Sequence, residues 1–548
     1  MKRFVTTILA IVMIAATTGC GNSQLSQNES ASTPSSSGTS TSTGSDASPE
    51  TTQSVITRGG HLTTSRIGIT PLNPLKYLAF QGDKILLGFF FDSLLQMNEN
   101  LELEPLLAES WEVSDDSKQI TLRLKEGVKY FDGTEMTAET VKYCWDWYLD
   151  PETNGNFYGQ INACKLVEAV DKYTIRFHFD EPDSGFLAQL TYQAGYPLAP
   201  SAIDEYKATG DDTIFAKKGG TGAFILSEQI EGVSTTGERN PNYHLMGEDG
   251  QPLPYLDKIT VTIIADESVA SANLISGDIH AVDNILLPAT MQQIDSSGVA
   301  HTHDIGPMMW WISLNVTQPP FDNQKVRQAF DYAFNRQELI DVIGLGEGLI
   351  TPWMILPTQS YYKDVPTTEY NPAKAKELLA EVGYPDGINV DFYYGTFGLL
   401  PTEAELCQAQ AKEAGFNLNL VGLDGATVKT MWYQNSSENP AGARLWFGYM
   451  PKQTAYVQIE YQTGKDALQN NSRWFDDEYQ ELLSELKITF DEAKTREIVS
   501  RMQDIALEQM PMVMLQCKSR KIAFGNAAHG IFVDNDGAMN FRAAWLES

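Results

Sequence analysis

The stretch ITLRLKEGVKYFDGTEMTAETVKYCWDWYL, residues 120–149, carries a strand signal and a helix signal in close succession. Ile120 to Leu124 alternate apolar and polar side chains, which is typical of a half-exposed strand. Thr137 can cap a helix, and Glu139 favours its first turn because an acid there complements the helix dipole. The apolar residues that follow share one face of that helix: Val141, Cys144, Trp145, Tyr148 and Leu149. The stretch therefore predicts mixed α/β structure.

Strand and helix signals alternate along the rest of the chain as well. Strands are expected at residues 174–179, 259–263 and 513–515, and helices at 326–334, 371–383 and 491–510. Asn371-Pro372 is a cap followed by proline at the first helical position. Gly219-Gly-Thr-Gly222 is either a flexible crossing between lobes or a tight turn. Strands that alternate with helices in this way indicate α/β lobes.

The first twenty residues have the pattern of a lipoprotein signal. Lys2 and Arg3 form a basic region, and residues 4–16 form a short apolar run without an acid. This run is too short to span a bilayer, and the small residues 17–19 stand directly before Cys20. Cleavage after residue 19 would leave Cys20 at a new N-terminus, ready for lipidation. A plain secretory signal with an incidental cysteine is the alternative.

Residues 20–56 are expected to form a tether that follows the lipidated cysteine. The segment consists almost entirely of Ser, Thr, Gly, Asn, Gln and a few acids. It cannot bury enough apolar surface to offset its conformational entropy, so we expect it to be disordered. A coil of this length reaches roughly 30–35 Å on average. A glycosylated stalk has a similar composition and stays open as an alternative.

Residues 57–548 form the body of the protein. They contain no second apolar stretch long enough to span a membrane, and their number indicates several lobes. The formal charge of the chain is −32 at pH 7. An acidic surface of this kind is repelled by nucleic acid and by anionic lipid, so neither is an expected partner. The charge is interpreted as a solvated extracellular surface.

The cysteines and histidines do not predict a metal site. Apart from Cys20, the cysteines are scattered, without a CxxC pair or a zinc spacing: Cys144, Cys164, Cys407 and Cys517. A Cys144–Cys164 disulfide is compatible with an exported protein, but a buried thiol on the apolar face of the helix is the simpler interpretation. The His301/His303 pair has no further ligand nearby in the sequence.

Motifs of the common hydrolases and nucleotide-binding proteins are absent from the sequence. There is no Gly-x-Ser-x-Gly, no His-Glu-x-x-His and no P-loop. The acid pairs Asp115-Asp116 and Asp476-Asp477 stand beside turn and helix-start signals, where acids favour solvent and the helix dipole. We therefore expect no enzyme activity, no catalytic residues, no cofactor and no metal.

Short motifs occur in a fixed order along the body. They are PLLAESW at 105–111, FDGT at 131–134, TAETV at 137–141, GTGAF at 220–224, RNPNY at 239–243, PYLDK at 254–258, SGD at 276–278, PFD at 320–322, VRQA at 326–329 and DEY at 477–479. The ordered set resembles the family 5 extracellular solute-binding proteins, which serve ABC importers of peptides, nickel and some oligosaccharides. The resemblance extends from about residue 57 to residue 548.

The resemblance implies a periplasmic-binding-protein-like clamshell of class II type, with α/β lobes and an additional inserted lobe. The first lobe would be assembled from residues 57–100, 219–289 and 501–548, the inserted lobe would occupy 101–218, and the second lobe 290–500. Ligand would lie between the lobes and stabilise the closed state, because it contacts both lobes only there. FDGT is then a structural turn, since Asp-Gly suits positive φ.

The resemblance also implies where ligand is held. In the peptide-binding branch, the aspartate of a Trp-x-x-Asp-Tyr segment takes the N-terminal ammonium of the peptide, because a buried cation needs an anion. Here Trp446 matches, but Tyr449 stands at the aspartate position. Either Asp424 or Glu438 supplies the charge, or the ligand is not an ordinary peptide. Tyr and Trp walls suit sugar rings equally well.

Further cleft residues follow from the same resemblance. Phe80 and Gln81 precede the first helix, and Tyr394 and Phe397 follow a strand of the second lobe. Trp311 belongs to a pair with Trp310, whose side chains point to opposite faces of a strand, so at most one of the pair would line the cleft. Core packing explains each of these aromatic residues at least as well as ligand contact does.

Together these expectations describe a monomeric solute-binding subunit that is lipid-anchored on the extracytoplasmic face of the cell membrane. It would capture a small molecule or peptide, with oligopeptide as the first choice, and deliver it to the permease subunits of an ABC importer. An oligosaccharide-binding subunit is the second choice because of Tyr449. A ligand sensor without a transport role is the third.

Overall fold

The computed structural model describes residues 56–68, 71–76, 81–98, 102–357, 359–433, 440–449, 454–465, 467, 469–534 and 537–547. Residues Ser54–Ser548 form one compact unit. The signal, Cys20, nearly all of the tether, Phe80 and Glu438 lie outside the described residues. Within the described ranges, no helix is long and apolar enough to cross a bilayer.

A ten-stranded sheet runs through the body in the order β14-β13-β15-β12-β16-β11-β1-β10-β9-β8. One group of its strands is β1 His61–Arg66, β8 Phe224–Ile230, β9 Ser234–Arg239, β10 Lys258–Ile263 and β11 Ala281–Ile285. The other group is β13 Ile388–Gly395, β14 Phe416–Leu423 and β15 Ala443–Tyr449. The expected strand at 259–263 is therefore confirmed as β10.

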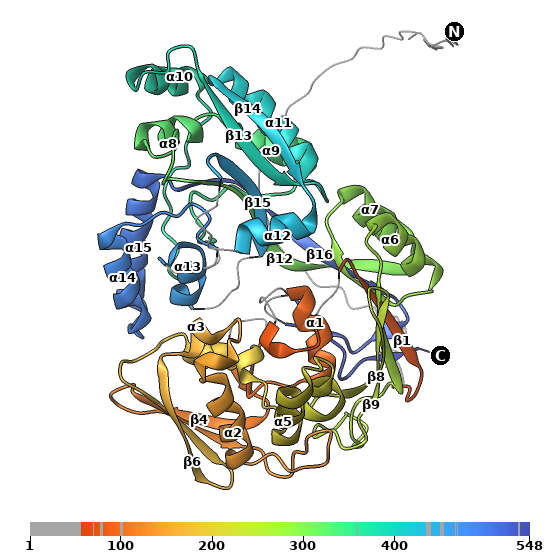
Figure 1. Ribbon diagram of the computed structural model, residues 1–548. Coiled ribbons are helices and arrows are strands. Elements are labelled where there is room, and N and C mark those ends of the chain that lie inside the picture. Colours follow the sequence, from red (N-terminus) through yellow and green to blue (C-terminus); the bar gives the residue numbers. More distant parts are fainter. Residues whose placement is uncertain are drawn as a thin grey trace, which may run out of the picture. The chain divides into compact units, whose positions relative to one another are not determined.

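Two long central strands connect these groups, β12 (Ala300–Leu314) and β16 (Met512–Gly525). They lie beside each other in the middle of the sheet (Figure 1). They are antiparallel, and their register shifts between Asp304 and Pro307 and again between Trp310 and Trp311. The C-terminal part of β16 pairs with β11, and the C-terminal part of β12 pairs with β15. The sheet thus passes from one group to the other inside β12 and β16. The lobe limits expected at 290 and 501 fall within α7 (Pro288–Ser296) and α15 (Glu492–Gln509).

Helices cover one face of the sheet at β12, β13, β14 and β15, and the opposite face at β12 and β16. One face packs against α8 (Gln324–Asp331), α10 (Pro372–Glu381) and α11 (Leu400–Glu413). The opposite face packs against α13 (Ala455–Thr463), α14 (Asp477–Lys487) and α15. The expected caps are confirmed, since Asn371 accepts from the amide of Lys374 and Asp491 from that of Lys494.

Residues 108–179 form a separate four-stranded sheet, in the order β4-β5-β7-β6. Its strands are β4 Ala108–Val113, β5 Gln119–Leu124, β6 Cys164–Asp171 and β7 Thr174–Phe179, and α2 (Ala138–Tyr148) follows β5. Both predictions for residues 120–149 are confirmed, because β5 alternates in burial and Thr137 caps α2. In FDGT, Gly133 has φ +85° and Asp132 accepts from the amide of Thr134 at 2.8 Å, so the motif is a turn.

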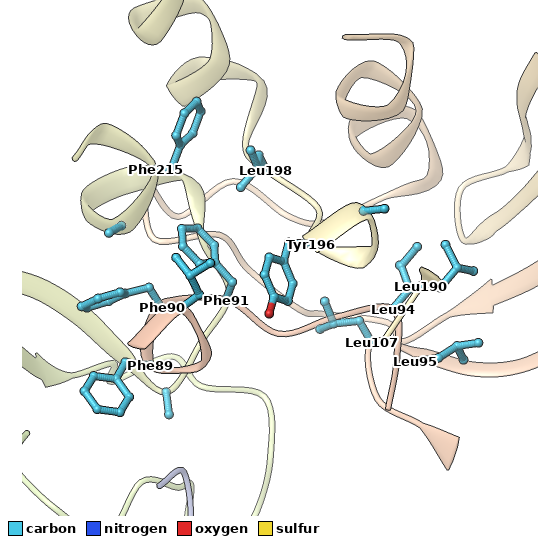
Figure 2. Close-up of a cluster of buried hydrophobic side chains, with 14 of the residues drawn as sticks. Phe89, Phe90, Phe91, Leu94, Leu95, Leu107, Leu190, Tyr196, Leu198 and Phe215 are labelled. Atoms are coloured by element: carbon cyan, nitrogen blue, oxygen red, sulfur yellow. The ribbon is translucent and has the colours of Figure 1, made fainter. Parts of the chain in front are cut away.

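One hydrophobic core joins this sheet to the strands around β1. Figure 2 shows part of it, where Phe91, directly after α1 (Gln81–Phe90), stacks on Tyr196 with ring centroids 5.6 Å apart. Phe89, Phe90 and Phe215 belong to the same core. A Cβ at Gly220 would lie 2.1 Å from the carbonyl oxygen of Phe90. The Gly219–Gly222 segment is therefore a buried, tightly packed turn and not a flexible crossing.

The four described cysteines, Cys144, Cys164, Cys407 and Cys517, are free and buried. Cys144 lies on the buried face of α2, where its sulfur accepts from the amide of Leu198 at 3.4 Å. The buried-thiol interpretation therefore holds, and Cys144 and Cys164 do not form a disulfide in this structure.

Candidate functional site

Three strands of the second group have their carboxyl ends at the same end of the large sheet. β13 runs parallel to β14 and to β15, so their carboxyl ends at Gly395, Leu423 and Tyr449 face the same way. In open α/β sheets, ligands bind outside the carboxyl ends of the strands. Helix α12 (Gly425–Tyr433) follows β14 at this end of the sheet. We call the residues around these three strand ends the strand-end site.

Aromatic side chains gather at the strand-end site. Trp446 of β15 meets Phe397 edge-on, with ring centroids 6.1 Å apart, and stacks on Phe447 at 5.5 Å. Phe447 in turn stacks on Trp310 of β12 at 5.3 Å. We call Phe397, Trp446, Phe447 and Trp310 the aromatic row. Trp446 and Phe447 are half-buried, so the row keeps accessible surface.

The apolar cluster next to Trp446 is small. Val428 of α12 is its one fully buried member among the described residues, and the side chains around it are half-buried: Tyr393, Phe397, Leu423, Met431 and Trp446. A fully formed core residue contacts many neighbours and excludes water from all of them. The strand-end site thus presents apolar surface that is only partly covered by the described residues.

The structure brings some of the expected ligand contacts together. Trp446 and Phe397 are in contact, and Tyr394 is half-buried on β13, one residue before the strand ends. Tyr449 is the last residue of β15 and pairs with Met308, while its side chain lies outside the described part.

The other expected contacts are not part of this cluster. Trp311 is 2% exposed, stands directly opposite Trp446 in the pairing of β12 with β15, and donates from Nε1 to Ser313 Oγ at 3.1 Å. It belongs to a buried cluster against which Trp446 also packs, and its contact with ligand stays a prediction. Gln81 begins α1 in the first group of elements, and Phe80 lies outside the described residues.

Asp424 is committed to capping α12. Its Oδ1 accepts from the amide of Thr427 at 3.0 Å and its Oδ2 from the Thr427 hydroxyl at 2.6 Å. A carboxylate that caps a helix in this way has its oxygens occupied, because they satisfy orphan groups of the first turn. Asp424 is thus poorly placed to replace the acid that Tyr449 lacks.

A buried arginine fixes the start of β15. Arg444 donates to the carbonyl oxygens of Asn471 and Pro440, each at 2.8 Å. Burial lowers the pKa of Arg444 to about 10, and the side chain is fully enclosed. It ties the strand to the neighbouring loops, and thereby holds Trp446 two residues further on.

Residues 183–185 contact helices α13 and α14. The Ser184 amide donates to the carbonyl oxygen of Lys487 at 2.8 Å, and the Ser184 hydroxyl donates to that of Leu486 at 3.3 Å. These carbonyls belong to the last turn of α14, which lacks intrahelical donors. Lys487 Nζ also lies 3.6 Å from Asp183 Oδ2. We call this set of contacts the interlobe contact, because it joins the 101–218 segment to the second group of elements.

A separate hollow lies between α1, residues 91–97 and the C-terminal tail. The charged groups on its wall already have partners: Lys84 pairs with Asp534 at 2.6 Å, and Arg542 donates to Gln96 at 2.5 Å. None of its lining residues belongs to the strand-end site. This hollow is therefore a weaker candidate for ligand binding.

Phe447 and Lys518 were not expected from the sequence, and Trp310 was considered only as the alternative to Trp311. Trp310 and Phe447 are directly opposite each other on β12 and β15, and Lys518 Nζ lies 4.5 Å from the centre of the Trp310 ring. The period of two did predict that Trp310 and Trp311 face opposite ways. The period alone does not give the strand pairing, and it is the pairing that places Trp310 opposite Phe447.

Comparisons with known proteins agree with this architecture. The family described as bacterial extracellular solute-binding proteins, family 5 Middle, matches residues 102–467. The glutathione-binding protein GsiB of Escherichia coli O1:K1 is 26% identical over 466 residues, which cover 84% of this chain and 89% of GsiB.

Solved structures share the fold. DppA of Helicobacter pylori, in complex with the peptide STSA, superposes with a TM-score of 0.79 at 23% identity, covering 90% of this chain and 99% of DppA. AgaA of A. tumefaciens R10, in complex with agropinic acid, gives 0.78 at 22% identity, covering 89% and 99%. Both are periplasmic binding proteins, so the α/β clamshell fold expected from the sequence is confirmed. This chain belongs to the family 5 extracellular solute-binding proteins of ABC importers.

Proposed function

We propose that this protein captures a short peptide at the strand-end site and delivers it to the permease of an ABC importer. The observation that carries the proposal is the half-buried aromatic row at the carboxyl ends of β13 and β15. Stacked rings with accessible faces offer apolar and aromatic contact to a ligand without further ordering of the protein.

The relatives support a peptide-like ligand. GsiB is named for glutathione, a tripeptide with a γ-glutamyl link, and the DppA structure holds the peptide STSA. AgaA binds agropinic acid, so the same fold also accepts other small molecules. We therefore choose glutathione and Ser-Thr-Ser-Ala as the first probes.

Native mass spectrometry of the full chain tests the proposal. The protein is purified without added ligand and challenged with glutathione, Ser-Thr-Ser-Ala and a mixture of oligosaccharides. We expect a complex with at least one of the two peptides. Capture of sugar while both peptides are ignored would replace the proposal with the oligosaccharide alternative, for which the stacked Trp446 and Phe447 rings are equally suited.

The interlobe contact supports a clamshell mechanism for capture. It joins residues 302 positions apart, and the groups involved would be separated and hydrated if the two sides moved apart. A ligand that contacts both sides favours the state in which they are together. On this proposal, the permease binds that closed state. A sensor would use the same motion, so loss of glutathione or peptide uptake on deletion of the importer distinguishes transport from sensing.

We also propose that Cys20 is the lipid-anchored N-terminus of the mature protein. The signal pattern of residues 1–19 supports this, together with the small residues before Cys20. A Cys20→Ser variant is expected to lose its acyl chains and appear in the culture medium or the soluble extracytoplasmic fraction. Intact mass of the purified protein measures the change. Acyl chains on the variant would contradict the anchor.

A further inference from the structure

A buried polar cluster lies where β12 and β16 pass between the two groups of strands. Lys518 and Gln516 come from β16, Trp310 from β12 and Glu403 from the first turn of α11. Lys518 is 5% exposed, and the other three are exposed by 1% or less. We call these four residues the crossover cluster. It adjoins the strand-end site, because Trp310 is also the inner member of the aromatic row.

The cluster is only partly hydrogen-bonded within the protein. Gln516 Nε2 donates to Glu403 Oε1 at 2.8 Å. Four other atoms are buried and have no hydrogen-bond partner among the described residues: Lys518 Nζ, Trp310 Nε1, Glu403 Oε2 and Gln516 Oε1. Each unsatisfied buried group costs about 1–3 kcal/mol, so native proteins seldom gather several in one place. Two of these atoms are donors and two are acceptors.

The cluster contains one basic side chain, Lys518, and one acidic side chain, Glu403, but the two do not form an ion pair in the described structure. Burial is the main cause that lowers the pKa of Lys518 to about 8 and raises that of Glu403 to about 7, while their mutual attraction opposes both shifts. The Lys518 ammonium lies over the Trp310 ring and makes no hydrogen bond to a described carboxylate.

Neighbouring charges are already engaged. Glu267 of α6 (Glu267–Ser276) attracts Lys518, but its carboxylate accepts from the amides of Leu286 and Leu287 at 3.0 and 2.9 Å. Arg336, the first residue of α9 (Arg336–Ile343), is paired with Asp331. Neither group is therefore available as a hydrogen-bond or ion-pair partner for Lys518 or Glu403.

We propose that the crossover cluster binds a zwitterionic α-amino-acid group of the ligand. Its carboxylate accepts from Lys518 Nζ and Trp310 Nε1, and its ammonium donates to Glu403 Oε2 and Gln516 Oε1. This inference rests on the proposed function. A group with both charges satisfies all four atoms and leaves the net charge unchanged, whereas a lone anion or cation leaves Glu403 or Lys518 buried without a partner.

The position of the cluster favours one class of peptide. Lys518, Trp310, Phe447 and Trp446 form a continuous series, so a ligand that places its charged head at Lys518 can extend along the rings. Ordinary peptides carry their ammonium and carboxylate at opposite ends, but a γ-glutamyl peptide such as glutathione carries both on one carbon. Recognition of such a head also removes the need for an acid at Tyr449.

Calorimetric titration at pH 7.5 tests the inference with four probes. They are glutathione, glutathione acetylated at the glutamyl amine, glutathione amidated at the glutamyl α-carboxylate, and Ser-Thr-Ser-Ala. Charged hydrogen bonds of about 1.5–3 kcal/mol predict that the wild-type protein binds glutathione roughly 10- to 100-fold more tightly than either modified form. Similar affinity for all three forms would overturn the inference without any variant.

Two variants assign the two charges. In Lys518→Met, we expect the preference over the amidated form to fall to within about threefold while the preference over the acetylated form remains. Glu403→Gln is expected to show the reverse pattern. Lys521→Met on the same strand and Glu405→Gln on an exposed turn of the same helix are the matched controls, and both should keep the wild-type ratios.

Each ratio is measured within one protein preparation, so a loss of folded material in a variant cancels. Equal weakening of all glutathione forms, with a lower melting temperature, would mean that Lys518 and Glu403 serve only packing, and would overturn the inference. Binding of Ser-Thr-Ser-Ala without glutathione would overturn it as well but leave the proposed function intact. Binding of neither peptide would overturn both this inference and the proposed function.

Discussion

Two tryptophans in this protein sit among aromatic rings, yet their surroundings differ. Trp145 of α2 is 1% exposed, and its ring lies 4.7 Å from that of Phe177 and 5.7 Å from that of Phe186. Trp446 is half-buried: it packs against buried clusters on several sides, but part of its own ring stays exposed. The first ring is surrounded by protein on all sides, while the second keeps part of its surface uncovered.

The difference separates packing from binding. Apolar surface that the fold covers contributes to stability, at about 25 cal/mol per Å² removed from water. Surface that the fold leaves uncovered contributes nothing until something else covers it. We therefore interpret Trp145 as part of the folding core and Trp446 as a surface prepared for ligand, and each substitution below is designed to separate these two roles.

Trp145→Ala is expected to give the largest effect. Removal of a fully buried indole leaves a cavity, which for Trp or Phe typically costs about 3–5 kcal/mol of unfolding free energy. Urea denaturation of the full chain measures this loss. The variant that remains folded should bind Ser-Thr-Ser-Ala or glutathione with wild-type affinity. Unchanged stability would show that the ring is not enclosed as the structure has it.

Trp446→Ala is expected to reverse this pattern. Because the ring is half-buried, its loss should lower the unfolding free energy by much less than the loss of Trp145. Affinity for the bound peptide should fall at least tenfold, about 1.4 kcal/mol, since one face of the row disappears. Calorimetry measures the affinity. Trp111→Ala, which removes another half-buried indole from β4, is the matched control and should bind normally. Unchanged affinity in Trp446→Ala would disprove the placement of the site.

Local signals predicted the elements around Trp145 well. The alternation at 120–124 and the cap at Thr137 act over a few residues, so β5 and α2 could be predicted from the sequence without knowledge of distant pairings. Trp446 was predicted only through the family resemblance. Its partner Phe397 lies on another strand end, and no local period connects the two.

The crossover cluster could not be predicted from local sequence signals either, because its residues come from distant parts of the chain. Glu403 and Gln516 are 113 residues apart, and they meet because the folded sheet brings the first turn of α11 beside β16. The pairing of β12 with β15 likewise places Trp310 opposite Phe447 and Trp311 opposite Trp446. Period two establishes that adjacent residues face opposite ways, but only the assembled sheet determines which ring of β15 each of them meets.

The interlobe contact provides a third environment, which is buried in this structure but would be exposed if the clamshell opened. A Cβ added at Gly185 would lie 2.7 Å from Val457 Cγ2, so one side of the contact must shift. We expect Gly185→Ala to lower ligand affinity about three- to tenfold, because overpacking of about 1 kcal/mol penalises only the closed state. Gly159→Ala, where a Cβ meets nothing within 4 Å, is the control. Equal affinities in both variants would show that the contact does not contribute to capture.

The smallest expected effect is a pH dependence of capture through Asp183. Burial in the interlobe contact raises the pKa of this carboxyl, and Lys487 only partly opposes the shift. Opening would return the pKa toward its ordinary value of about 3.9, so the closed state binds a proton more readily than the open state. Closure should therefore become more favourable as pH falls through the raised pKa, and lose this contribution as pH rises.

Calorimetry of Ser-Thr-Ser-Ala or glutathione at pH 7 and at pH 4.5 measures this linkage. We expect the ratio of wild-type to Asp183→Asn affinity to rise a few-fold at the lower pH, less than the tenfold that a full unit of pKa shift permits. Glu181→Gln is the control, because that neighbouring side chain is 77% exposed and keeps its hydration in both states. A ratio that stays constant, or falls, would mean that Asp183 is as hydrated in the ligand-bound protein as in the free one, and that the contact, unlike the Trp145 core, is not enclosed when ligand binds.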